Sequence, residues 1–269
     1  MDQDAPAGID PTTPNIARVY DAALGGKDNF AVDRQMVELG RQVAPDAPDT
    51  ARANRQFLRR VVRELAARGV EQFLDIGSGL PTVGNVHEVA QAVNPHARVV
   101  YVDFDPVVLA HGRALLSNDH TTIVTADVRD PDLLGHPGIT SLLDLRRPVG
   151  LLMFAILHHL DDDEDPGGIV ARLRDSLAPG SHLAISHFHL PVETAPELVP
   201  EIQEGERLFN ATLGTGRWRT RAQITEFFGD FELLDPGVVP VNDWRPEGNE
   251  VRLFPPTHHG IAGGVARKH

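Results

Sequence analysis

The feature that most constrains the fold of this chain is an alternation of two apolar patterns from residue 70 onward. Short runs rich in Val, Ile, Leu and Phe, typical of buried strands, take turns with longer stretches whose apolar residues recur at helical spacing. Parallel strands need helical crossovers between them, so this order predicts a doubly wound α/β sheet with helices on both faces. The strand-like runs are VEQFLDI, ARVVYVD, HTTIVTAD, RPVGLLMFAI and SHLAISHF.

The segments on either side extend this plan. Residues 1–14 are rich in proline and acids and are expected to form a mobile tail. Residues 15–69 are predicted to form an N-terminal helical cap or lid, in which the basic stretch 52–68 is a solvated face with arginine stems on apolar surface. Residues 70–269 form the predicted core, with a helical insertion at about 191–214. A last strand in GIAGGVARKH is expected to form a hairpin with ELLDPGVVPV, which gives a mostly parallel, seven-stranded sheet.

Charge and composition limit what such a chain can bind. There are 38 acidic against 25 basic residues, and the net charge of -13 offers no general attraction to nucleic acids or anionic membranes. We therefore expect neither as a partner. The sequence contains no cysteine, which excludes disulfides, thiolate metal sites and a cysteine nucleophile. It has no signal-like start and no apolar run of membrane-spanning length, so we expect a cytoplasmic protein.

The first predicted strand ends in an acid followed by two glycines, in QFLDIGSGLP. In an open parallel sheet the ligand crevice lies beyond the carboxyl ends of the strands, so Asp75, Gly77 and Gly79 are expected to line it. A dinucleotide site would have a third glycine where Thr82 stands, and the charge of Asp75 would repel a pyrophosphate. S-adenosylmethionine (SAM) instead carries a sulfonium and an ammonium group. The loop therefore favours SAM over NAD.

Acids also end the next two predicted strands. Asp103 closes ARVVYVD, where a carboxylate accepts hydrogen bonds from both hydroxyls of a ribose. Asp127 closes HTTIVTAD, where we expect its carboxylate to accept from an adenine amino group beside the backbone N–H of Val128. An aspartate at a strand end can also cap a helix or turn. Three such acids in succession favour a nucleoside site.

Several long stretches resemble one family. They are FLDIGSGLPTVGNVHEVAQ, ARVVYVDFDPVVLAHGRALL, NIARVYDAALGGKDNFAVDR, FFGDFELLDPGVVPVNDWRPEG and GGVARK, and they span nearly the whole chain from Asn15 to Arg267. The chain resembles the actinobacterial S-adenosyl methyltransferase family, long known as a domain of unknown function and a branch of the Rossmann-like class I methyltransferases. The first loop departs from the broad class I pattern, because Leu80-Pro81-Thr82 replaces a third glycine. The resemblance implies SAM binding through Asp75, Gly77, Ser78, Gly79, Asp103, Asp127 and Val128, to which we add Phe104 and Phe154.

The N-terminal stretch NIARVYDAALGGKDNF has the composition of a lid. Gly25 and Gly26 offer a hinge, Tyr20 a flat surface and Asn29 a polar tip, which together suit closure over a nucleoside. We therefore assign Tyr20, Gly26 and Asn29 to the cofactor site. The alternative is a helical cover for the sheet with no contact to a ligand.

Two histidines follow the fourth strand, in MFAILHHLDDDED. Class I methyltransferases that act on small molecules present residues to the acceptor at this position, so His158 or His159 is a candidate general base. The alternative is that one packs against the next helix while the other is solvated. His187 and His189 in SHFHL are less specific candidates. The acids after His159 are more typical of a solvated loop or a helix start than of a metal site, and we predict no functional metal ion.

Together these patterns predict a SAM-dependent methyltransferase that acts on a small-molecule acceptor. Methyl transfer is an in-line displacement in which the cofactor supplies the reactive group and the protein orients the two reactants. One alternative is a SAM-binding sensor or regulatory partner without turnover, since no residue is an unmistakable catalyst. An NAD-dependent oxidoreductase is disfavoured by Asp75 and Thr82. The acceptor and the oligomeric state are left open by the sequence.

Overall fold

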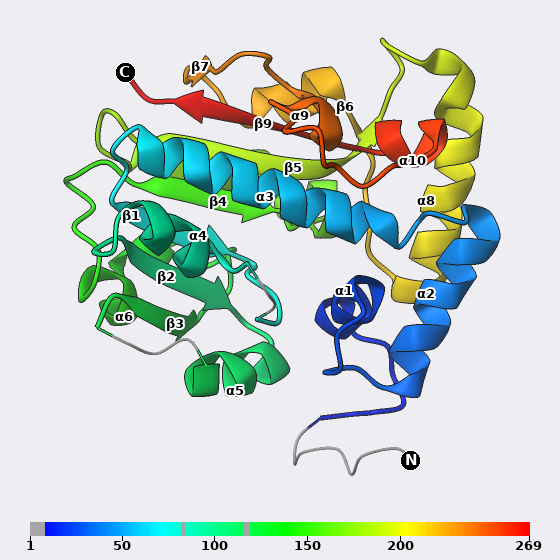
Figure 1. Ribbon diagram of the computed structural model, residues 1–269, viewed down its shortest axis with the longest axis horizontal. Helices are drawn as coiled ribbons and strands as arrows, with labels where there is room; N and C mark the ends of the chain where they lie inside the picture. The colour runs from blue at the N-terminus through cyan, green and yellow to red at the C-terminus, as the bar shows by residue number, and fades with distance from the viewer. Residues whose placement is uncertain (1–8, 82–83, 116–118) are drawn as a thin grey trace.

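The computed structural model describes residues 9–81, 84–115 and 119–269, and a mostly parallel sheet forms its centre (Figure 1). Residues 1–8 of the predicted tail and Thr82 of the predicted first loop lie outside the described residues. The strand order is β3-β2-β1-β4-β5-β9-β7, and β9 runs antiparallel to both of its neighbours. The strands of this order are β1 (Gln72–Ile76), β2 (Arg98–Asp103), β3 (Thr121–Thr125), β4 (Gly150–Phe154), β5 (His182–Leu190), β7 (Glu232–Leu233) and β9 (Ile261–Arg267).

The predicted doubly wound α/β class is confirmed, with two differences in the strands. Within the described residues the sheet has nine strands rather than seven, because the two-residue strands β6 (Arg219–Thr220) and β8 (Val239–Pro240) pair with β5 and β9. The third strand ends at Thr125, so Asp127 lies two residues beyond it in a turn. The predicted hairpin is confirmed by antiparallel pairing of β9 with β7 and β8.

Burial on both faces explains why the strands are so apolar. Alternate residues such as Phe73 and Tyr101 belong to the same core cluster as the buried residues of α3 (Asp49–Ala67), whereas Leu74 and Val100 belong to the cluster on the opposite face. Each fully buried side chain of this size contributes roughly 1.5–3 kcal/mol through removal of apolar surface from water. By packing, α3 thus belongs to the core of the sheet, although it lies within the predicted cap.

The chain reverses its direction of travel across the sheet between β3 and β4. It begins at β1, moves outward to β3, and then returns to place β4 on the other side of β1. The carboxyl ends of β1 and β4 therefore form the switch point at which such sheets bind ligands. In Figure 1 the arrowheads of β2 and β4 point toward the side where α1, α2 and α8 lie. The remaining α-helices are α1 (Ile16–Leu24), α2 (Ala31–Val43), α4 (Val86–Val93), α5 (Pro106–Leu115), α6 (Pro137–Thr140), α7 (Pro166–Asp175), α8 (Val199–Leu213), α9 (Arg221–Glu226) and α10 (Pro255–His259).

A buried ion pair joins α1 to α2. Arg18 and Asp33 are 3 % and 0 % exposed, and Arg18 Nε donates to Asp33 Oδ2 over 2.8 Å. The same carboxylate accepts the backbone N–H groups of Asn15 and Phe30. Asn15 Nδ2 also donates to Asp105 Oδ2 over 2.6 Å, which links the start of α1 to the segment after β2. The two helices are therefore fixed to each other and to the carboxyl end of the sheet.

We expect Asp33→Ala to lower the free energy of unfolding by about 3–5 kcal/mol, because it leaves Arg18 buried without its partner charge. The control is Glu38→Ala on the same helix, whose partner Arg41 is 48 % exposed; it is expected to change stability by less than about 1 kcal/mol. Urea unfolding of both variants measures the difference. Equal losses would show that the buried pair does not hold the two helices in place.

Candidate active site

The loop after β1 depends on two glycines for different reasons. Gly77 has φ of 70°, and a Cβ added there would lie 2.5 Å from Ile156 Cδ1, so the loop packs closely against the segment after β4. Gly79 has φ of 66° and nothing within 4 Å of an added Cβ. A side chain at Gly77 is therefore excluded by both backbone and contact, whereas Gly79 borders open space. The N–H of Gly77 donates to Val102 O over 2.8 Å and anchors the loop to β2.

Asp103 is held firmly at the end of β2. It is 8 % exposed, and its two carboxylate oxygens accept the backbone N–H groups of Gly79 and Asp105, each over 2.9 Å. Burial raises the pKa of this carboxyl group, while those backbone hydrogen bonds lower it. Each carboxylate oxygen has a further lone pair for a ribose hydroxyl. The neighbouring Phe104 is 60 % exposed and offers a flat apolar surface beside Asp103.

Asp75 is the most strongly perturbed acid at this end of the sheet. Its side chain shares the α3 face of β1 with Phe73, and the residue is 4 % exposed. Burial raises its pKa to about 7, against a lowering effect of Arg55 and a further raising effect of Asp103. A buried carboxyl group of this kind is stabilised in its charged form by a nearby cation. The site thus favours a positively charged group of a ligand.

The other predicted cofactor residues differ in how far they are already engaged by the rest of the chain. Ser78 Oγ is buried and has no hydrogen-bond partner within the described part of the chain, so it is available to a ligand. Asp127 accepts the backbone N–H and the guanidinium of Arg129, each over 2.9 Å, and the adjoining Val128 is 6 % exposed. Phe154 packs edge-on against Phe57, with ring centroids 5.5 Å apart, in the core beneath α3.

Two of the residues predicted to form a lid contact Asp21 rather than extending outward. A Cβ added at Gly26 would lie 2.0 Å from Asp21 Oδ1, and Asn29 Nδ2 donates to Asp21 Oδ2 over 2.8 Å. Asp21 thus shapes the loop between α1 and α2. Tyr20 points toward α3, where its hydroxyl donates to Ala51 O over 3.1 Å. Contact of these residues with the cofactor stays a prediction.

A hydrogen-bonded chain connects Tyr20 to the end of β4. Asn54 Nδ2 donates to the Tyr20 hydroxyl over 3.0 Å, and Asn54 Oδ1 accepts from Ser186 Oγ over 2.6 Å. Ser186 Oγ in turn accepts the backbone N–H of Ala155 over 3.0 Å. Ala155 has φ of 55°, which costs energy for a residue with a Cβ and often marks a functional site. This strained residue directly follows β4 at the switch point, and nothing in the local sequence predicts its strain.

The two candidate histidines differ in their hydrogen bonds. His158 is 1 % exposed, and its Nδ1 accepts the backbone N–H of Phe188 over 3.2 Å. Burial and the neighbouring His159 and His187 lower its pKa well below the usual value, so the ring is neutral and its proton lies on Nε2. With Nδ1 already accepting, His158 lacks a free lone pair. It is poorly suited to the predicted role of general base.

His159 is half-buried and lies 3.2 Å from Thr215 Oγ1 through its Nδ1. Burial lowers its pKa to about 4, although a hydrogen bond to the Thr215 backbone raises it. If Nδ1 carries the proton that is donated to Thr215, Nε2 holds a lone pair. Of the two histidines, His159 is therefore the one able to accept a hydrogen bond or a proton.

Half-buried aromatic rings surround His159. Phe188 of β5 stacks on Trp218, with ring centroids 4.1 Å apart at 15°, and Phe209 of α8 lies 6.2 Å from His159. We call His159, Phe188, Phe209 and Trp218 the aromatic cluster. Its members come from separate segments that meet beyond the carboxyl end of β4, beside the last residues of β5. The cluster offers flat apolar surfaces next to the switch point.

Sequence reasoning missed two buried arginines near this site. Arg219 of β6 is 6 % exposed and donates to Leu157 O over 3.1 Å, to Leu160 O over 3.2 Å and to Asp162 Oδ1 over 2.6 Å. It thereby holds the loop that carries both candidate histidines. No local pattern around RWRT, which contains Arg219, indicates this role, because all of its partners lie far away in the chain.

The second missed residue is Arg55 of α3. Residues 52–68 were expected to be a solvated face, yet Arg55 is 9 % exposed and Arg60 only 5 %. Arg55 falls on the same helical stripe as Ala51 and Leu58, so its spacing could have indicated burial. Its side chain influences the pKa of Asp75 and therefore lies near the predicted cofactor site.

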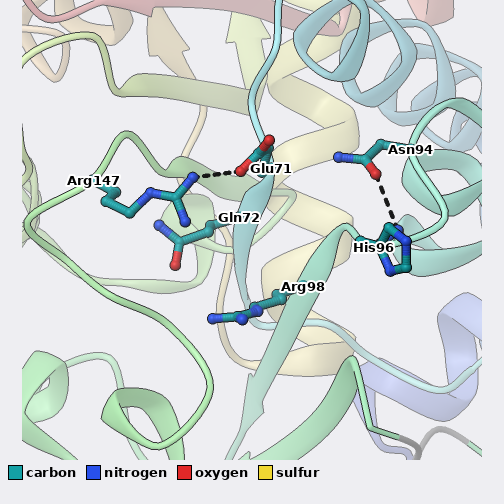
Figure 2. Close-up of a pocket in the computed structure, with 6 residues that line it drawn as sticks. All are labelled: Glu71, Gln72, Asn94, His96, Arg98 and Arg147. Atoms are coloured by element: carbon teal, nitrogen blue, oxygen red, sulfur yellow. Dashed lines mark hydrogen bonds and ion pairs between the residues drawn. The ribbon is translucent and has the colours of Figure 1, made fainter.

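A separate shallow cavity of about 190 Å³ lies at the opposite side of the sheet, where the strands begin (Figure 2). In doubly wound sheets ligands bind at the carboxyl ends of the strands, so we do not assign it to the cofactor. The cavity is lined by residues at the amino ends of β1 and β2 and by nearby loops: Glu71, Gln72, Asn94, His96, Arg98 and Arg147.

Among the residues that the structure describes, no group of three or more His, Asp or Glu side chains is arranged to hold a metal ion.

The fold is that of Rossmann-like class I SAM-dependent methyltransferases. The sequence model of the family described as S-adenosyl methyltransferase matches residues 2–269, and the chain belongs to this family. SAM is accordingly its cofactor, and the predicted family resemblance is confirmed. No curated protein matches the chain significantly.

Solved structures agree with this family. A candidate methyltransferase from Thermobifida fusca is 46% identical, with a TM-score of 0.89 over 98% of each chain. A DUF574-family protein from Streptomyces avermitilis is 40% identical, with a TM-score of 0.88 over 96% of this chain and 98% of that one. Human N-acetylserotonin methyltransferase in complex with SAM is 15% identical, with a TM-score of 0.50 over 96% of this chain and 63% of its own, and shares the fold alone. Within the described ranges, no helix has the length and apolarity needed to cross a membrane.

The raised pKa of Asp75 predicts a pH-dependent cost to stability. Its pKa of about 7 in the folded protein lies above the value of 3.8 that is usual for an aspartate, so the free energy of unfolding falls as pH rises from about 4 to 7. We expect Asp75→Asn to be more stable than the wild type at pH 8 by at least about 1 kcal/mol, since one unit of pKa corresponds to about 1.4 kcal/mol. The gain should shrink toward pH 5. Urea unfolding across this range tests it, and a gain that is independent of pH would contradict it.

Proposed function

We propose that the methyl acceptor is a small molecule that binds between the cofactor and the aromatic cluster. The observation that carries this proposal is the gathering of four half-buried rings beyond β4 and beside the end of β5. Ile156, which packs against Gly77, lies in the same segment as His159 and places the cluster beside the cofactor loop. Flat apolar walls with few polar groups are typical of small-molecule sites.

The residues at the switch point fit SAM. Asp103 would accept hydrogen bonds from the ribose hydroxyls, and the exposed ring of Phe104 would lie against the adenine. Asp75 would accept from the ammonium group, and Ser78 Oγ has a free hydrogen-bonding capacity in the same loop. When bound, SAM would supply a methyl group on a sulfonium: an acceptor atom would bond to the methyl carbon in line as the carbon–sulfur bond breaks and S-adenosylhomocysteine leaves. The protein's own contribution is then mainly orientation of the two partners.

We assign the acceptor contact to His159 rather than His158. The Nε2 lone pair of His159 can accept a hydrogen bond from a hydroxyl or an N–H group of the acceptor and can take its proton. Its pKa of about 4 keeps it deprotonated at neutral pH, so it is available as an acceptor there. The same low pKa makes it a weak base, which suits orientation of the acceptor better than deprotonation of a strongly held proton.

Macromolecular acceptors fit the charge of the chain less well. The net charge of -13 opposes binding of nucleic acids and of anionic membrane surfaces, and we propose that neither is a partner. A small acceptor needs no such attraction.

The proposal is tested with SAM that carries a labelled methyl group. The protein is incubated with actinobacterial extract that has been separated into small-molecule and macromolecular fractions. We expect label to enter the small-molecule fraction, and an Asp103→Ala variant, weakened in cofactor binding, to transfer much less. Transfer into protein or nucleic acid would overturn a small acceptor. Absence of transfer into every fraction, with SAM still bound, would favour the sensor.

Once an acceptor is found, two matched substitutions separate the histidines. Asparagine can replace the hydrogen bond of Nδ1 but has no counterpart of Nε2. We expect His159→Asn to lower kcat/KM roughly 10²-fold, within the range for loss of a positioned acid–base group. His158→Asn keeps an acceptor for the N–H of Phe188 and should change kcat/KM only a few-fold. Steady-state kinetics measure both, and the reverse order would return the acceptor contact to His158.

A further inference from the structure

We propose that Arg55 of α3 binds the carboxylate of the methionine part of SAM, and that Arg55 and Asp75 together form a pair matched to its zwitterionic amino acid group. This role for Arg55 rests on the cofactor placement given under the proposed function. It assigns the residue that receives the negative end of the ligand, for which the first loop offers no obvious side chain.

The side chain of Arg55 extends from α3 to the loop after β1. Its Nη2 is 3.4 Å from Leu80 O, immediately after the two glycines. The positive charge of Arg55 lowers the pKa of Asp75, so the two groups face a common region. Nevertheless, among the described residues no carboxylate oxygen lies within the 4.0 Å of an ion pair from Arg55. The opposite charges are close enough to interact but not in contact.

Arg55 also has fewer partners than the other buried arginines. Arg18, Arg60 and Arg219 each donate to at least three oxygens, over distances from 2.5 to 3.3 Å. Arg55, by contrast, has a buried Nε with no hydrogen-bond partner among the residues that the structure describes. A buried guanidinium with free donors is costly unless it meets an acceptor, and carboxylates are its best match. The missing partner is therefore an anion.

The neighbouring groups indicate which anion fits. A phosphate would meet the charge of Asp75 as well as the guanidinium, whereas an amino acid presents its carboxylate and its ammonium one carbon apart. Tyr20 of α1 lies against Arg55, with the guanidinium carbon 5.7 Å from the ring centroid. α1 therefore covers this side of the pair, and exclusion of water strengthens contacts between charged groups.

The test compares three ligands by calorimetry: S-adenosylhomocysteine, its decarboxylated analogue, and 5′-methylthioadenosine, which lacks the whole amino acid group. We expect the wild type to bind S-adenosylhomocysteine roughly 10- to 100-fold more tightly than the decarboxylated analogue, as a buried charge-assisted hydrogen bond allows. Arg55→Gln should remove this preference and leave binding of 5′-methylthioadenosine unchanged. Arg52→Gln is the matched control, because Arg52 lies on the same helix with a side chain that is 52 % exposed; it should bind as the wild type does.

The outcomes separate this role from the cofactor placement itself. A wild type that binds none of the three nucleosides would overturn that placement. A wild type that binds them, with the preference for the carboxylate unchanged in Arg55→Gln, would show that Arg55 only balances the charge of Asp75. If Arg55→Gln does not fold, Arg55→Lys decides, because it keeps the charge and loses the planar fork. Its preference should fall several-fold, and an unchanged preference would overturn the assignment.

Discussion

The structure depends on a parallel sheet that is buried on both faces. In such strands charged side chains lie at or near the ends, because a charged group in the middle would face packed helices on either side. The polar chemistry is therefore concentrated beyond the carboxyl ends of the strands. The return of the chain from β3 to β4 then places the carboxyl end of β4 beside that of β1. The candidate contacts of Asp75, Gly77, Ser78 and Gly79 to the cofactor follow from that placement.

Buried charge at this place opposes stability and serves binding. Asp75 and Arg55 are both nearly enclosed, and neither has a close partner of opposite charge among the described residues. Each of these buried charges lowers the stability of the folded protein, and a ligand with the complementary charges can offset that loss. By contrast, Arg18 and Arg219 each donate several hydrogen bonds to oxygens. Arg18 thereby holds the N-terminal helices in place, and Arg219 holds the loop that carries the two histidines. The number of partners thus separates arginines that hold the fold from one that awaits a ligand.

Much of the site could be inferred from local pattern. Asp75 and Asp103 stand at strand ends that period and composition reveal, and the glycine loop lies between a strand and a helix, as its spacing predicts. Contacts between residues of different segments could not be predicted in this way. Whether Asn29 reaches a ligand depends on Asp21, which takes its amide in the loop. The strain at Ala155 likewise arises from packing and hydrogen bonds around the end of β4, with no mark in its sequence.

The sequence by itself determined the α/β class, the order of strands and helices, the acids at the strand ends and the family, because these follow from periodicity and from motifs within single segments. Only the tertiary structure decided which histidine keeps a ring nitrogen available and which buried arginine has an Nε without a partner among the described residues. The physical reason is that these properties belong to hydrogen bonds between distant segments. His158 is engaged by Phe188, 30 residues away, and His159 by Thr215, 56 residues away. No local pattern encodes such pairings, so they appear only when the chain is folded.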